Sequence, residues 1–162
     1  MASTNKERIA QMLELLQAGL LPFVQREMES EYRGLWLKQA AYSLNNLDEN
    51  DPHFDVYALL KIMWDQWNNV FSTTLGHAER SLVSELRSVR NQWAHQETFS
   101  GDDAYRALDS AARLLTAISA SEAREVERMK QELLRIRFDE QARRERRKAA
   151  MTPTEGKPSA GL

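Results

Sequence analysis

The sequence predicts an all-α protein, and three observations support that fold class. Apolar residues recur three and four positions apart in successive segments, which is the spacing of one helix face. No segment alternates apolar and polar residues for long enough to indicate a strand. The chain of 162 residues has only 6 Gly and 4 Pro, fewer than a β-sandwich or a doubly wound α/β fold needs for its turns. We therefore expect a bundle of four to five helices with a longer C-terminal helix.

The N-terminal part predicts three helical pieces. Thr4, with Glu7 three positions later, has the spacing of a capping box and opens the first helix. We expect Gly19 to end that helix and Pro22 to begin the second, because proline suits the first helical position. A third helical piece follows over residues 35–44.

The middle of the chain predicts the core helix and two further helices. Asp55 can cap a helix that runs until Gly76 and carries the most apolar pattern of the chain. Its apolar positions are Leu59, Leu60, Met63, Trp64, Trp67, Val70 and Phe71. The next helix runs from Ala78 through Trp93, and Ser100 opens another with capping-box spacing to Asp103.

The C-terminal part predicts a last helix from Ser121 and then a tail. We divide the chain into a helical domain (1–120), a basic helix (121–150) and a linker-like tail (151–162). The last helix carries a heptad-like seam for packing or dimer contact, formed by Val126, Met129, Leu133 and Ile136.

Five basic residues gather near the end of that helix. They are Arg143, Arg144, Arg146, Arg147 and Lys148, interrupted only by Glu145, whereas the whole chain has a formal net charge of −2. Cations suit the negative pole of a helix, so this segment can be a solvated helix end. The alternative is contact with RNA phosphates.

Composition excludes several function classes. The chain has no cysteine, so disulfides, thiolate nucleophiles and cysteine-bound metals are excluded. We expect no metal and no cofactor, and no Gly-rich phosphate loop indicates an ATPase. No apolar run approaches the roughly 20 residues of a membrane span, and the N-terminus lacks the pattern of a secretory signal. We therefore expect a cytoplasmic protein.

One stretch carries candidate chemistry, RNQWAH at residues 90–95. On a helix, Asn91 and His95 share a face, whereas Arg90 lies about 140° around the axis from His95. Arginine can bind phosphate through two hydrogen bonds, and histidine can transfer protons near neutral pH. Such a set suits a phosphodiester, although the same residues also cap helices or bind carboxylates.

This motif resembles the Arg-x4-His motif of the HEPN superfamily. The sequence ELRSVRNQWAHQETFSGDDAYRALDSAARLLTAI (residues 85–118) is similar to a Swt-type HEPN domain, which often opens large bacterial proteins that continue into an ATPase region. The segment GLLPFVQREMESEYRGLW (19–36) is similar to the first helices of that family. The resemblance covers roughly residues 10–120.

The resemblance implies a homodimer that brings two motifs into one cleft. Many HEPN domains are metal-independent endoribonucleases, in which the RNA 2′-hydroxyl attacks the adjacent phosphate. It implies proton transfer by His95, phosphate binding by Arg90 and orientation by Asn91, in a bacterial defence or toxin-like setting. Other HEPN domains only bind RNA or dimerise a larger machine, so a non-catalytic module that regulates a C-terminal ATPase is the alternative.

Overall fold

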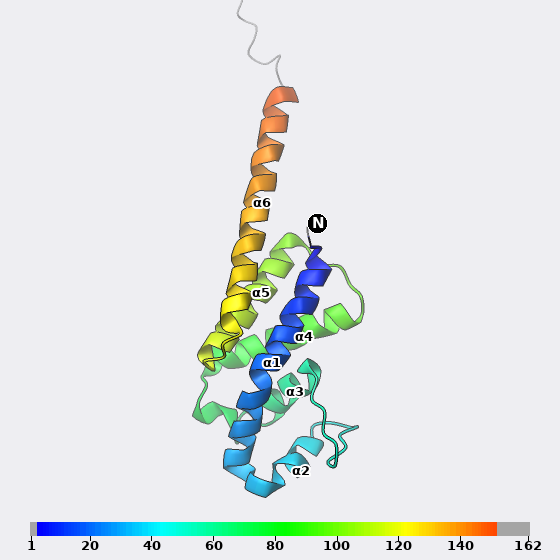
Figure 1. Ribbon diagram of the computed structural model, residues 1–162, viewed down its shortest axis with the longest axis vertical. Coiled ribbons are helices and arrows are strands. Elements are labelled where there is room, and N and C mark those ends of the chain that lie inside the picture. Colours follow the sequence, from blue (N-terminus) through cyan, green and yellow to red (C-terminus); the bar gives the residue numbers. More distant parts are fainter. Residues whose placement is uncertain (1–2, 152–162) are drawn as a thin grey trace, which may run out of the picture.

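The computed structural model describes residues 3–151, and its regular elements there are all helical, which confirms the predicted fold class (Figure 1). The α-helices are α1 (Asn5–Tyr32), α2 (Trp36–Ala41), α3 (Val56–Asp65), α4 (His77–Ala94), α5 (Gly101–Ala117) and α6 (Ala123–Met151). Short 3₁₀ turns cover Arg33–Leu35 and Phe71–Thr73. Within the described residues, no helix combines the length and apolar character that a membrane crossing requires.

The expected break in the first helix was wrong, because α1 continues through both Gly19 and Pro22. Pro22 is exposed, and the buried face continues past it with Phe23 and Val24, so burial outweighs the one lost hydrogen bond. Gly19 has a packing role instead. A Cβ built there would lie 2.5 Å from Leu115 Cδ2, so glycine allows α1 to approach the end of α5 closely.

The predicted core helix is shorter than expected, since α3 ends at Asp65 rather than near Gly76. A series of turns follows, in which Val70 N–H donates to Gln66 O at 2.8 Å. Trp67, Val70 and Phe71 are nevertheless buried. Their spacing therefore reports burial correctly but not a continuous helix, because turns can keep the same side chains on the core.

The residues that cap the helices were predicted more accurately than the lengths of the helices. Asp55 accepts a hydrogen bond from Ala58 N–H at 2.8 Å and begins α3. Ser100 and Asp103 form the expected capping box of α5, with the Asp103 N–H donating to Ser100 Oγ at 3.0 Å. Thr4 caps α1 in the same way through Glu7 N–H, at 3.1 Å.

The first half of α6 completes the core against α5. Val126, Met129 and Leu133 of the predicted seam are buried in the same hydrophobic cluster as the apolar faces of α1 and α5, and Ile136 is half-buried. Three of the four seam residues are thus used for packing within the chain. The second half of α6 projects beyond the other helices (Figure 1). Met151 is the last described residue of the predicted tail, and residues 152–162 lie outside the described part of the chain.

Candidate functional site at the end of helix α4

The candidate motif lies on α4, whose position is set by its apolar face. Val83 and Leu86 are fully buried, and Val89 and Trp93 pack against the core from half-buried positions. Val89 and Trp93 thus hold the C-terminal half of α4 against the core. Because these residues turn one face inward, the opposite face of α4 is left to polar and charged side chains.

The C-terminus of α4 ends in an ordered Schellman motif. Gln96 adopts a left-handed conformation with φ 59°. Its N–H donates to Trp93 O at 3.0 Å, and the N–H of Glu97 donates to Gln92 O at 3.0 Å. His95 is the last residue before this reversal, and its side chain is exposed. The helix does not fray at the motif; it stops at His95 in a defined conformation.

Side chains from α4 and α1 hold the loop after His95 in place. The Gln92 amide donates to Thr98 O at 2.9 Å, and the Asn5 amide of α1 donates to Phe99 O at 3.1 Å. Phe99 itself is buried. Gln92 and Asn5 thus act as positioning residues that the sequence did not single out, because both contacts depend on the fold.

Arg90 lies against α3 rather than beside His95. Its guanidinium carbon is 4.8 Å from the centre of the Tyr57 ring, which is a cation–π contact. The side chain is half-buried and forms no ion pair with a carboxylate of the described chain. Asn91 and His95 are exposed one turn apart. The structure of one chain therefore places the three motif residues at one end of α4, where the His95 N–H donates to Asn91 O at 3.0 Å but no hydrogen bond joins their side chains.

Two further arginines of α4 pack on an aromatic ring, and the sequence analysis did not identify them. The guanidinium carbons of Arg80 and Arg87 lie 4.6 Å and 6.0 Å from the centre of the Trp64 ring. The Nε atoms of both are buried without a hydrogen-bond partner. One sequence signal could have indicated these contacts. Tyr57 and Trp64 are seven residues apart and therefore share one face of α3, the face that meets the arginines of α4.

The five basic residues of 143–148 lie elsewhere. All five are exposed on the second half of α6, whereas α4 ends at the side of the bundle (Figure 1). Arg144 lines a pocket beside the starts of α1 and α5. A single protomer therefore does not bring this basic segment to the motif at His95.

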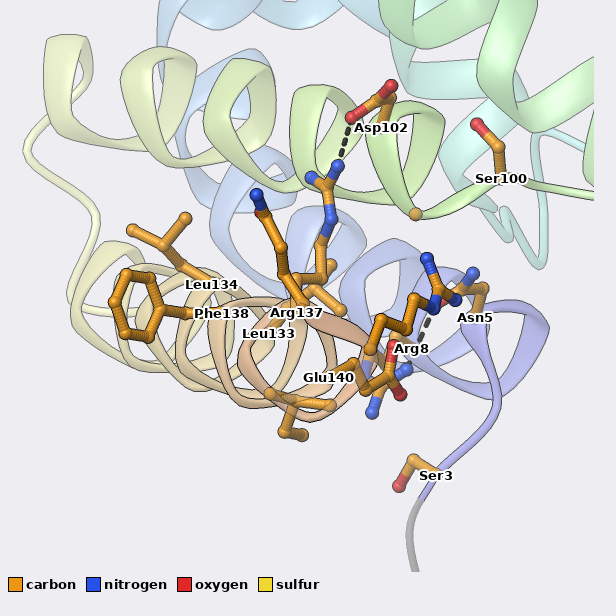
Figure 2. A pocket seen from close by; sticks show the side chains of 14 residues that line it. Ser3, Asn5, Arg8, Ser100, Asp102, Leu133, Leu134, Arg137, Phe138 and Glu140 are labelled. Carbon is orange, nitrogen blue, oxygen red and sulfur yellow. Dashed lines mark hydrogen bonds and ion pairs between the residues drawn. The ribbon is translucent and has the colours of Figure 1, made fainter. Parts of the chain in front are cut away.

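A pocket between the starts of α1 and α5 and the middle of α6 is also polar (Figure 2). Two of its charged groups are engaged locally, since Arg137 pairs with Asp102 and Arg8 donates to Asn5 Oδ1 at 2.9 Å. Arg144, a candidate RNA-contacting residue, also lines this pocket. Leu134 and Phe138 line its rim and are exposed. None of the predicted motif residues lines this pocket.

The other two histidines lie apart from the motif. His53 is exposed in the loop before α3 and lies 3.3 Å from Asp51. His77 is the first residue of α4, at the opposite end of that helix from His95. His95 is thus the histidine that shares a helix end with an unpaired arginine.

Comparison with known proteins supplies the family. A family model described as Swt1-like HEPN matches residues 11–119. No match was found among curated proteins or among solved structures. The matched segment covers α1 to α5 and includes the whole RNQWAH motif. The chain therefore belongs to the Swt1-like HEPN family.

Proposed function

We propose that this protein is a metal-independent endoribonuclease whose active site is shared between two copies of the chain. The observation that carries the proposal is the end of α4. Within a HEPN domain, His95 and Asn91 are exposed at an ordered helix end, and Arg90 is held there without a carboxylate partner.

The reaction needs two proton movements at one phosphodiester. The RNA 2′-hydroxyl loses its proton and attacks the adjacent phosphorus. The bond to the 5′-oxygen breaks, and that oxygen gains a proton. The products are a 2′,3′-cyclic phosphate and a free 5′-hydroxyl, so no further reactant is consumed. His95 serves as the proton-transfer group, and Arg90 stabilises the negative charge that develops on the phosphate oxygens.

The arrangement in one chain explains why two copies are needed. His95 has no side-chain hydrogen bond that would orient it, and Arg90 leans away from it onto Tyr57. One imidazole cannot accept one proton and donate another at the same moment. Two motifs in one cleft supply a base, an acid and two guanidiniums, so a homodimer is part of this proposal.

The second candidate is a non-catalytic module that dimerises and binds RNA within a larger ATPase-containing protein. It is favoured by α6, whose basic half projects from the domain and would suit a connection between modules (Figure 1). In this alternative the motif contacts RNA or the partner copy but transfers no proton. Both candidates place the protein in the cytoplasm.

Product analysis separates the two candidates. Single-stranded RNA is incubated with the protein in EDTA, and the products are tested for 2′,3′-cyclic phosphate ends. The nuclease proposal predicts cleavage with cyclic ends. Cleavage that stops in EDTA and returns with Mg²⁺ would reject the mechanism in favour of a two-metal reaction. RNA binding without cleavage would favour the non-catalytic module.

Arg90→Lys tests the role of the guanidinium. Lysine keeps a positive charge near Tyr57 but cannot hold two phosphate oxygens in a fork, so cleavage should fall by about 10²–10³-fold. Arg26→Lys is the matched control, since Arg26 is exposed on α1 and packs on Phe23 in a similar way. Equal cleavage by the wild type and Arg90→Lys would remove Arg90 from phosphate binding.

The molar mass of the protein in solution tests whether two copies share the site. Light scattering at micromolar concentration should give about twice the 18.7 kDa of one chain. A monomer that still cleaves RNA would contradict the shared site.

A further inference from the structure

We propose that the outer face of α4 binds the phosphate backbone of single-stranded RNA along its whole length and guides the strand to the motif at His95. This inference rests on the proposed function, because it assumes that RNA is the ligand of that motif. It assigns a role to residues between His77 and Ser88, which lie outside the motif.

Six residues of α4 share one face of the helix. His77, Arg80, Ser84, Ser88, Asn91 and His95 are separated by steps of 3, 4, 4, 3 and 4 residues, so they form one stripe on the helix surface. We call these six residues the α4 stripe. All are exposed except Arg80, which is half-buried. The helix has 18 residues, so the stripe extends for about 27 Å and ends at the motif.

Three arginines beside this stripe pack on aromatic rings. Arg80 and Arg87 pack on Trp64, and Arg90 packs on Tyr57, so the three guanidiniums contact α3 along the side of α4 that faces it. None has a carboxylate partner among the described residues. Stacking on the rings holds the guanidiniums in place without neutralising their charge, and the Nε atoms of Arg80 and Arg87 are buried without a hydrogen-bond partner.

A groove at the start of α4 is lined by hydrogen-bond donors. Its lining combines Trp64 and Arg80 with the hydroxyls of Ser81 and Ser84, and with Ser88, whose hydroxyl donates to Ser84 O at 3.4 Å. The one carboxylate that lines it, Glu85, is already paired with Arg106 of α5. Hydroxyl and guanidinium donors without a free carboxylate favour an anionic ligand with many acceptor oxygens.

Single-stranded RNA fits this surface better than an acidic protein segment. The cations follow one line along one helix, which matches the repeated charge of one strand. The line leads directly to Arg90, Asn91 and His95, where the proposed reaction needs a phosphodiester. An acidic peptide would account for the charge but not for the continuity with the motif.

The test measures how RNA affinity depends on salt. The probe is a single-stranded RNA with methylated 2′-hydroxyls, which the proposed mechanism cannot cleave. For single strands, each phosphate contact contributes about 0.7 to the slope of log affinity against log salt concentration. The double variant Arg80→Gln/Arg87→Gln should therefore lower the magnitude of the slope by about 1.4.

The matched control is Arg26→Gln/Arg124→Gln, which removes the same charge from exposed positions on α1 and α6. It should leave the slope within the error of the wild type. Helical content and unfolding midpoint are measured for both double variants, and the single variants Arg80→Gln and Arg87→Gln replace the double if it does not fold. Each single variant should lower the slope by about 0.7.

The outcomes separate this inference from the proposed function. An unchanged slope in Arg80→Gln/Arg87→Gln, with cleavage retained, would overturn RNA binding by α4 but leave the nuclease standing. A reduced slope without any cleavage by the wild type would support RNA binding by α4 and reject the nuclease. No RNA binding by the wild type, or equal competition by poly-glutamate of matched charge, would overturn RNA binding by α4.

Discussion

The cations of α4 and those of the first half of α6 meet different partners. On α6, Arg128 is bound by Glu125 and Glu132, and Lys130 lies 3.0 Å from both Asp109 and Glu127. On α4, Arg80, Arg87 and Arg90 rest on aromatic rings and have no carboxylate within the described chain. Arg128 and Lys130 are thus neutralised by carboxylates inside the molecule, whereas the three arginines of α4 meet no carboxylate in the described part of the chain.

We propose that this difference separates arginines with a structural role from arginines that bind a ligand. Stacking on Tyr57 and Trp64 positions a guanidinium without neutralising it, whereas an ion pair neutralises it. The comparison leads to predictions about stability on α6 and about chemistry on α4.

The largest stability effect should come from Leu133→Ala on α6. Leu133 is 2% exposed against α5, so its truncation should lower the free energy of unfolding by about 2–5 kcal/mol. Phe138→Ala is the control on the same helix, because Phe138 is 72% exposed; its change should stay within about 0.5 kcal/mol. Chemical denaturation measures both. Equal losses would mean that Phe138 is buried in an assembly with another copy.

Lys130→Met tests the ionic contacts between α5 and α6, with an expected loss of about 1–2 kcal/mol at pH 7. Burial raises the pKa of Asp109, but hydrogen bonds from Lys130 and Arg113 outweigh it, so the pKa lies below its ordinary value of 3.8. The folded state therefore gains stability from ionised Asp109 above about pH 4 and loses it as the pH falls through the lowered pKa.

The difference between wild type and Lys130→Met should consequently shrink when unfolding is measured near pH 3. Glu127 should act in the same direction, since hydrogen bonds from Gln131 and Lys130 lower its pKa. A difference that does not depend on pH would show that Lys130 acts through packing of its aliphatic stem instead.

The smallest effect on stability should come from the two residues with positive φ that follow α4 and α5. Gln96 and Ser119 both have φ 59°, a conformation that suits glycine. Gln96→Gly and Ser119→Gly should each raise the free energy of unfolding by about 0.5–1 kcal/mol. Thermal unfolding measures this gain. Only Gln96→Gly should also change RNA cleavage, because Gln96 adjoins His95; the same activity change in Ser119→Gly would remove the link to the motif.

The sequence predicted the fold class and the helix caps because these depend on local patterns. Asp55 and Ser100 act on amides three residues away, and the apolar spacing identifies the core face of each helix. The continuity of α1 was not predictable in this way. Gly19 is explained by Leu115, almost one hundred positions later in the chain, and local rules for glycine therefore gave the wrong boundary.

The surroundings of the candidate motif were not predictable from the sequence for the same reason. The motif residues were identified from their types and spacing, but the contact between Arg90 and Tyr57 depends on how α3 packs against α4. Arg80, Arg87 and Trp64 form their stack across the same two helices, so no single segment indicated it.

The most direct test of the account compares His95→Ala with His53→Ala. Both histidines are exposed, and His53 lies in the loop before α3, away from the motif. RNA cleavage in EDTA should fall by about 10²–10⁴-fold in His95→Ala and stay at the wild-type rate in His53→Ala, with RNA binding and thermal stability retained in both. A stable His95→Ala protein that cleaves RNA at the wild-type rate would contradict the central claim that the end of α4 is the active site.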